Sequence, residues 1–300
     1  MNVGIIGLGN IGFNYDKNNN NKTLSLTKAF SREKFFNLII GVEKKKKVRN
    51  IFKRKNPSTE VSNKISIFKG KKIHLIAIST PTKMHKTSIY QTLNYIKKPK
   101  LLIEKPISYR KEEFQEILKI INSKKIVAFI NYQRQSNPLF INLREKLKRS
   151  KKTEIVVKYS KGIYNNASHF LTFLISVYGR SLKILKTQNL KKYKNDYLIN
   201  FDIKYKKCLI KFRYTQSTNQ MTCIDNKIFF VSNKDKIIFR YNKKNVYNKK
   251  EISEIIRHNQ LYVIKNLEKF FKKKKSNLCR LNKSYVTELI INNIINFKNV

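Results

Sequence analysis

Apolar and polar positions in the first 130 residues alternate between short apolar runs and amphipathic stretches. The apolar runs have the length expected of buried strands, and they cover 2–6, 36–42, 72–79, 100–103 and 125–131. Between them the pattern predicts helices over 23–31, 83–96 and 110–123. Strands that alternate with helices are typical of a doubly wound parallel sheet. We therefore predict an α/β domain of this class over residues 1–130.

The pattern changes after residue 131. Helices are expected over 138–149 and 167–178, with a strand over 153–159 between them. From residue 183 to 241 one strand follows another, and polar turns separate the predicted strands 196–205, 208–214, 227–232 and 236–241. The end of the chain is predicted to be helical over 250–271 and 284–297. Residues 131–300 are therefore expected to form an α+β domain built on an open, largely antiparallel sheet.

The charge of the chain is extreme, with 66 Lys and Arg against 18 Asp and Glu and a formal net charge of +48. Such a charge is found in nucleic-acid-binding proteins. However, most of the cations are lysines spread along the whole chain, and Asn, Ile, Phe and Tyr are abundant as well, as an AT-rich coding sequence produces. Specific recognition of nucleic acid usually adds arginines and a known module. We expect no specific nucleic-acid partner, although the field would attract anionic ligands.

Other features of the composition point to a cytoplasmic protein. The apolar start of the chain lacks a basic segment and carries glycines in a turn pattern, so it is interpreted as structure and not as a secretory signal. No apolar stretch approaches the roughly 20 residues that span a bilayer. Cys208, Cys223 and Cys279 are odd in number and far apart, which argues against disulfides and a zinc site. No metal site is predicted.

A glycine-rich run, Gly7-Leu8-Gly9-Asn10-Ile11-Gly12, follows the first predicted strand directly. In the pattern G-x-G-x-x-G the first glycine permits a tight turn and the second lets the backbone approach a pyrophosphate. The third glycine allows a helix to pack closely on the strand. We therefore predict a dinucleotide site at this loop, with the N-terminus of the following helix directed at the phosphates.

Glu43 ends the second predicted strand, where an acid accepts hydrogen bonds from the adenosine ribose and favours NAD. It lies further from the glycines than usual because of an Asn-rich insertion over 17–22. Lys44 and Lys45 follow at once and could instead meet the 2′-phosphate of NADP. The sequence thus leaves NAD(H) and NADP(H) open, with NAD slightly favoured.

Two more predicted strands of this domain end in residues suited to a binding site. The third is closed by Ser79-Thr80-Pro81, with His85 at the start of the next helix, and the fourth by Glu104-Lys105-Pro106. The carboxyl ends of parallel strands are where doubly wound sheets bind ligands. A lysine there can act as a general acid or base when burial and neighbouring charge lower its pKa.

The order and spacing of GLGNIG, STPTKMH, LLIEKPIS and INYQR resemble the glucose–fructose oxidoreductase / inositol dehydrogenase / MocA (Gfo/Idh/MocA) family. The resemblance runs along most of the chain and is strongest over residues 1–140. It implies an N-terminal Rossmann domain that binds NAD(H) or NADP(H). It also implies a C-terminal domain that shapes a sugar or polyol site and often forms homo-oligomers. On this basis the expected cofactor contacts are Gly7, Gly9, Asn10, Ile11, Gly12, Glu43, Thr80, Pro81, His85 and Glu104.

The resemblance also assigns catalytic and substrate residues. The lysine that handles the proton of the reacting hydroxyl corresponds to Lys105, and Tyr132 and Arg134 border the substrate. The family motif D-x-G-x-H-x-x-D corresponds to 165–172, where the histidine is His169 but Asn165 and Thr172 replace both aspartates. On a helix, 165 and 169 share one face, so both are candidate substrate contacts. Because an Asn cannot take a proton, Lys105 and His169 are the expected catalytic pair.

Three functional hypotheses follow. The first is an oxidoreductase that transfers a hydride between nicotinamide and a carbinol carbon of a sugar, polyol or nucleotide sugar, in the metabolism of surface-polysaccharide sugars. The second, motivated by the missing aspartates, is a catalytically impaired dinucleotide-binding protein or sensor. The third, motivated by charge alone, is a nucleic-acid-binding protein.

Overall fold

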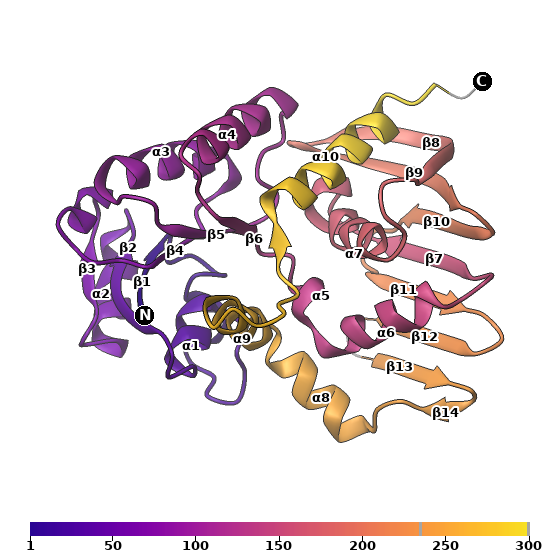
Figure 1. Ribbon diagram of the computed structural model, residues 1–300, viewed down its shortest axis with the longest axis horizontal. Helices are drawn as coiled ribbons and strands as arrows, with labels where there is room; N and C mark the ends of the chain where they lie inside the picture. The colour runs from indigo at the N-terminus through magenta and orange to yellow at the C-terminus, as the bar shows by residue number, and fades with distance from the viewer. Residues whose placement is uncertain (234–235, 299–300) are drawn as a thin grey trace. The chain divides into compact units, whose positions relative to one another are not determined.

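The computed structural model describes residues 1–233 and 236–298. These residues form two compact units. The first unit contains Met1–Ser136 and Ile256–Asn282, and the second contains Asn137–Ile255 and the chain from Lys283 onward. The predicted domains 1–130 and 131–300 differ from this division in two respects: the boundary follows Ser136, and a segment near the C-terminus returns to the N-terminal unit (Figure 1).

The first unit is built on a seven-stranded sheet that is parallel except for its last strand. Across the sheet the strands are β3 (Glu60–Ser62), β2 (Asn37–Val42), β1 (Asn2–Ile6), β4 (Leu75–Ile78), β5 (Lys100–Ile103), β6 (Ala128–Ile130) and β15 (Cys279–Arg280). The five predicted strands are all present. β3 and β15 are additional; both are short and carry polar residues, which gives them no periodic apolar signal.

Helices cover both faces of this sheet, as Figure 1 shows. The helices of the unit are α1 (Leu26–Ser31), α2 (Lys46–Lys55), α3 (His85–Tyr95), α4 (Lys111–Ser123), α5 (Gln133–Ser136) and α9 (Asn259–Phe271). Phe30 of α1 and Ile264 of α9 belong to one buried cluster with Val3 and Ile5 of β1. The doubly wound α/β fold predicted from the alternation is therefore confirmed.

The helix that follows the glycine run, predicted over 23–31, is α1, and it does not begin at the run itself. Residues after Gly9 form irregular turns and a 3-10 helix over Asn14–Asp16, and α1 begins only at Leu26. The buried Asp16 carboxylate accepts hydrogen bonds from the backbone N–H groups of Leu24 and Ser25, the latter over 3.0 Å. This contact closes the Asn-rich insertion into a loop, so the helix starts after the insertion, where Ser25 is its N-cap.

The second unit is built on an eight-stranded sheet. Its strands in spatial order are β14 (Lys244–Asn245), β13 (Lys236–Tyr241), β12 (Ile228–Asn233), β11 (Gln220–Ile224), β7 (Glu154–Tyr159), β10 (Cys208–Tyr214), β9 (Asp196–Tyr205) and β8 (Lys183–Tyr193). Among the described residues of this sheet, only β7 and β10 are parallel neighbours. The predicted open, largely antiparallel sheet is confirmed.

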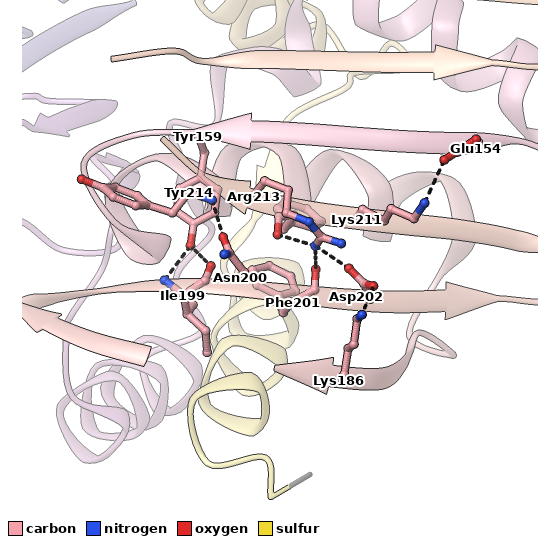
Figure 2. A network of polar contacts seen from close by, with 11 residues as sticks. Glu154, Tyr159, Lys186, Ile199, Asn200, Phe201, Asp202, Lys211, Arg213 and Tyr214 are labelled. Atoms are coloured by element: carbon pink, nitrogen blue, oxygen red, sulfur yellow. Dashed lines mark hydrogen bonds and ion pairs between the residues drawn. The ribbon is translucent and has the colours of Figure 1, made fainter. Parts of the chain in front are cut away.

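Three helices, α6 (Pro138–Lys148), α7 (Ser168–Tyr178) and α10 (Leu281–Ile295), lie along one face of this sheet in Figure 1. Ion pairs and hydrogen bonds join neighbouring strands, as at Asp202 of β9, whose carboxylate meets Arg213 of β10 and Lys186 of β8 (Figure 2).

The predicted helix 250–271 is two helices, α8 (Lys249–Arg257) and α9, which are separated at His258. The backbone of His258 leaves the helical region, and its Nδ1 lies 2.8 Å from the Thr23 hydroxyl. The break allows α9 to pack in the first unit against α1. No helix within the described residues is long and apolar enough to cross a membrane.

Candidate functional site

The strand order of the first unit reverses at β1, which has β2 on one side and β4 on the other. Backbone hydrogen bonds between neighbouring strands continue just beyond the carboxyl ends of β1 and β4. The Gly7 N–H donates to Val42 O over 2.8 Å, and the Ser79 N–H donates to Ile6 O over 2.8 Å. In doubly wound sheets such a reversal is where loops separate and ligands bind. The glycine run and Thr80-Pro81 therefore flank the expected crevice.

The three glycines of the run have different structural requirements. Gly7 has φ +91°, and a Cβ there would lie 2.7 Å from the backbone of Ser79 and Thr80. At Gly12 a Cβ would lie 2.1 Å from Gly7 O. At Gly9 a Cβ would meet no atom of the described residues within 4 Å. Gly7 and Gly12 are thus required by the fold, whereas Gly9 leaves open space beside the backbone, as a cradle for a diphosphate needs.

The two residues between the second and third glycines support the loop by backbone contacts. Asn10 O accepts from the Tyr15 N–H over 3.1 Å, and Ile11 O accepts from the Leu26 N–H over 2.8 Å. Gly12 O accepts from both the N–H and the hydroxyl of Thr27 in α1. The short helix α1 therefore supports the glycine loop through these hydrogen bonds, although it does not follow the glycine run directly.

Glu43 is tied to the glycine loop. Its Oε2 accepts from the Leu8 N–H over 2.9 Å, and its Oε1 accepts from the Lys45 N–H over 3.0 Å. The half-buried carboxylate thus lies at the end of β2 beside the crevice, with both oxygens fixed by backbone donors. Each oxygen retains lone-pair capacity for a ligand hydroxyl.

A cavity of about 550 Å³ opens at this edge of the sheet. Its walls include Gly7, Glu43 and Thr80 together with three lysines, Lys44, Lys45 and Lys64. Its volume is in the range of small-molecule sites, and the apolar side chains of Val42, Ile65 and Met84 beside these polar groups suit a purine and its ribose. Lys64 was not singled out from the sequence; it precedes a short 3-10 helix, Ile65–Phe68, that carries no motif.

His85 is buried at the start of α3. Its Nε2 lies 3.0 Å from Thr80 O, and its Nδ1 lies 3.2 Å from Ile107 O. Burial lowers the pKa of the imidazole, so it is neutral at physiological pH and donates from one nitrogen at a time. The ring therefore lies between the loops after β4 and β5 and donates to a carbonyl of one of them, Thr80 O or Ile107 O, according to its tautomer.

Glu104 lies at the end of β5, is 8% exposed, and accepts a hydrogen bond from Asn131 Nδ2. The same amide group donates to Gln260 Oε1 of α9 over 3.2 Å. Burial raises the pKa of Glu104 to about 7, against the opposing effects of Asn131 and the Lys105 ammonium. Asn131 and Gln260 were not identified from the sequence, because they are separated by 129 residues and carry no motif.

The predicted substrate residues of this unit lie just beyond β5 and β6. Lys105 is half-buried and follows Glu104 directly, and its peptide bond to Pro106 is cis. Tyr132 is buried, and Arg134 lies half-buried in α5. Burial lowers the pKa of Arg134 to about 10, which leaves the guanidinium charged at neutral pH.

The second unit holds the other predicted residues. Asn165 lies in a π-helical turn, Ile163–Ala167, and His169 lies in the first turn of α7; both are half-buried. Thr172, at the place of the second family aspartate, is buried, and its hydroxyl lies 3.0 Å from that of Thr287 in α10. Asn165 donates from Nδ2 to Asp196 Oδ2 over 2.8 Å. No motif in the sequence points to Asp196, which is the first residue of β9.

A parallel sheet that reverses at β1, a glycine turn at that point and a carboxylate at the end of β2 define a dinucleotide-binding domain of the Rossmann type. Residues 1–132 match the Gfo/Idh/MocA family model, described as an oxidoreductase family with an NAD-binding Rossmann fold. This is the family that the motifs of residues 1–132 resemble. No curated protein matches the chain in sequence.

Solved structures share the fold of the whole chain. A dehydrogenase (MviM) from Clostridium difficile has a TM-score of 0.77 at 12% identity, covering 99% of this chain and 99% of its own. The WlbA dehydrogenase from Bordetella pertussis, in complex with NADH and UDP-GlcNAcA, has 0.73 at 11%, covering 98% and 94%. A variant of the 3-ketoreductase KijD10 from Actinomadura kijaniata, with TDP-benzene and NADP, has 0.73 at 9%, covering 98% and 96%.

Proposed function

We propose that the protein is an NAD(P)-dependent oxidoreductase that transfers a hydride between the nicotinamide and a carbinol carbon of a nucleotide-linked sugar. The observation that carries this proposal is the edge of the first sheet, where Gly9 leaves room for a diphosphate and Glu43 lines a cavity next to it. Substrates of this class fit the structural neighbours, whose complexes contain UDP-GlcNAcA in one case and TDP-benzene in another.

The residues present fit a bound dinucleotide. The loop Gly7–Gly12 would hold its diphosphate, and Thr80 and Pro81 would border the other side of the crevice. The nicotinamide, when bound, supplies the hydride acceptor or donor. The buried His85 ring lies between Thr80 O and Ile107 O and donates to one of them, so it packs between the loop after β4 and the loop after β5, which carries Lys105.

NAD is the proposed cofactor, ahead of NADP. Both oxygens of Glu43 are fixed by backbone N–H groups, so the carboxylate cannot swing away to admit a 2′-phosphate without losing these bonds. Lys44, Lys45 and Lys64 line the same cavity and oppose this preference, because ammonium groups attract a phosphate.

Lys105 is the proposed proton-transfer residue for the reacting hydroxyl, and His169 the residue that orients or relays that proton. Tyr132, Arg134 and Asn165 are proposed substrate contacts. A lysine gives up its proton readily when a site desolvates it. Asn165 can orient a hydroxyl by hydrogen bonding, but it cannot accept its proton.

Nicotinamide absorbance during incubation with a panel of UDP- and TDP-linked sugars tests the proposal. We expect turnover with at least one sugar, and its loss in Lys105→Ala with NADH binding intact. Lys124→Ala, which removes an exposed lysine of the same unit, is the control and should retain wild-type turnover. Turnover that survives Lys105→Ala would contradict the assigned role.

A second candidate is a dinucleotide-binding protein that no longer catalyses the reaction. The observation in its favour is that Thr172 is buried against Thr287 and carries no ionisable group. Tight NADH binding without turnover on any sugar of the panel would support this candidate over the first.

A further inference from the structure

The turn that carries Asn165 lies on a buried carboxylate from another strand. Asp196 is 2% exposed, and its Oδ1 accepts from the N–H groups of Tyr164 over 3.0 Å and Tyr197 over 2.7 Å. Its Oδ2 accepts from the backbone N–H of Asn165 over 2.9 Å and from its side-chain Nδ2 over 2.8 Å. Four donors thus meet the roughly four acceptor sites of one carboxylate.

Gly162 makes room for this carboxylate. It has φ +92°, and a Cβ there would lie 2.3 Å from Cγ and 2.3 Å from Oδ2 of Asp196. Any other residue would therefore meet both a disfavoured backbone conformation and a steric clash. The backbone at the start of the turn therefore packs directly against the Asp196 carboxylate.

The same turn leads directly to His169. The N–H groups of Asn166 and Ala167 both donate to Gly162 O, and the Ser168 hydroxyl donates to Tyr164 O over 2.6 Å. Tyr164 is thus bonded to Asp196 through its N–H and to the first residue of α7 through its carbonyl. A shift of the Asp196 carboxylate would be passed to the start of α7, where His169 is the second residue.

The contact with Asp196 also fixes the orientation of the Asn165 amide. Because Nδ2 donates to Asp196, the amide oxygen is turned away from the carboxylate. Glu288 of α10 is a second buried acid, and burial together with the charge of Asp196 holds its pKa well above the usual range. Burial raises the pKa of Asp196 as well, but its four N–H donors stabilise the ionised carboxylate and oppose that effect.

We propose that Asp196 is a positioning residue of the substrate site, which holds the Asn165 amide and the turn into His169 and places a negative charge one hydrogen bond from residue 165. The inference rests on the proposed function for what Asn165 and His169 act on. Its geometric part concerns the second unit alone.

An exchange of the two side chains tests the proposal in the full-length protein. Asp196→Asn removes the charge and sets two N–H donors against an amide nitrogen, and Asn165→Asp sets two carboxylates against each other. Each single variant should lower kcat/KM for the best nucleotide sugar about 10- to 100-fold, mainly through kcat, because misplaced groups lose transition-state contacts. The double variant restores one amide–carboxylate contact in reverse, but it leaves the backbone N–H of residue 165 facing an amide nitrogen, so it should recover only part of the loss.

Asp202→Asn is the matched control. Asp202 is a buried acid of the same strand, but it pairs with Arg213 and Lys186 and not with the turn (Figure 2). It should leave kcat/KM within about two-fold of wild type, although it removes a buried ion pair. A loss in Asp202→Asn equal to that in Asp196→Asn, or a double variant no better than the weaker single variant, would overturn the proposal.

A second measurement does not depend on turnover. The chain has only four histidines, so the imidazole Cε1–H resonances are few, and that of His169 is assigned by its loss in His169→Gln. Without NADH, this resonance should move in Asp196→Asn, return towards its wild-type position in the double variant and stay in place in Asp202→Asn. A resonance that does not move in Asp196→Asn refutes the positioning role. If it moves while no sugar is turned over, the proposed function fails and the positioning role stands.

Discussion

The carboxylate of Glu43 accepts a hydrogen bond from the Leu8 backbone N–H over 2.9 Å, which ties the end of β2 to the loop after β1. The acid expected to contact the cofactor ribose thus also supports the loop expected to contact the diphosphate. One side chain therefore couples two halves of the candidate cofactor site.

Glu43→Gln should weaken NADH binding about ten-fold and shift the preference towards NADPH. The amide has only one oxygen for two backbone donors, so either the Leu8 or the Lys45 N–H loses its acceptor. The lost negative charge also leaves Lys44, Lys45 and Lys64 to attract a 2′-phosphate. Fluorescence titration with both cofactors measures the effect.

Glu60→Gln is the control for this experiment, because Glu60 is an exposed acid of the neighbouring strand β3, paired with Lys71 over 2.7 Å. It should bind both cofactors like the wild type. An unchanged ratio of NADH to NADPH affinity in Glu43→Gln would contradict the proposed basis of cofactor choice.

Gly9→Ala and Gly12→Ala should separate cofactor binding from folding. At Gly12 a Cβ would press on Gly7 O, so the variant should lose about 1–3 kcal/mol of unfolding free energy or more. At Gly9 no described atom lies within 4 Å of the added methyl, so the melting temperature should stay unchanged while NADH affinity falls. Thermal unfolding and NADH titration of both variants check this, and full NADH affinity in Gly9→Ala would show that the diphosphate lies elsewhere.

The part of the fold that could be predicted from the sequence is the part with a strong local signal. Buried parallel strands such as β4 (Leu75–Ile78) are continuous apolar runs, and the glycines at 7 and 12 are required by local backbone geometry. By contrast, α2 (Lys46–Lys55) was missed because lysines surround its apolar positions, among them the buried Phe52. In so basic a chain the polar face of a helix is rich in lysine, as a loop is, so composition does not distinguish the two.

The residues of the site that were not predicted act through contacts between distant segments. Asp196 lies 31 residues from Asn165 along the chain, and no pattern links the start of β9 to that turn. The sequence showed only that the family aspartate at 165 was missing. The structure adds that a carboxylate from another strand is hydrogen-bonded to the Asn in its place.

The positive charge should make the protein more stable as salt is added. With a formal net charge of +48, like charges repel throughout the native surface, and ions screen this repulsion at about 10 Å in roughly 0.1 M salt. We expect the melting temperature to rise by several degrees between about 0.02 M and 0.3 M NaCl. An equal melting temperature at both concentrations would show that the charges are already compensated.

Binding to nucleic acid should be weak and unspecific. Mixed-sequence DNA should associate at low salt through released counterions and be lost over a modest rise in salt. Fluorescence anisotropy with labelled DNA at several NaCl concentrations measures this. Binding that persists at physiological salt, with a preference for one sequence, would favour the nucleic-acid hypothesis over the oxidoreductase.

Glu104 should make the native state less stable as the pH rises. Burial raises its folded-state pKa from 4.5 to about 7, so the folded protein binds this proton more tightly than the unfolded chain does. The stabilising contribution is complete below pH 4.5 and is lost as the pH rises through about 7, to a total of roughly 3 kcal/mol. Glu104→Gln cannot ionise and keeps an oxygen for the Asn131 amide.

The free energy of unfolding of Glu104→Gln should therefore rise relative to that of the wild type between about pH 5 and about pH 8, the range over which Glu104 titrates. Denaturant unfolding at several pH values measures the difference, with Glu60→Gln as an exposed control that should show little change. A Glu104→Gln difference that is constant with pH would mean that Glu104 stays ionised in the native state. In that case the attraction of Lys105 and the Asn131 hydrogen bond outweigh the cost of burial.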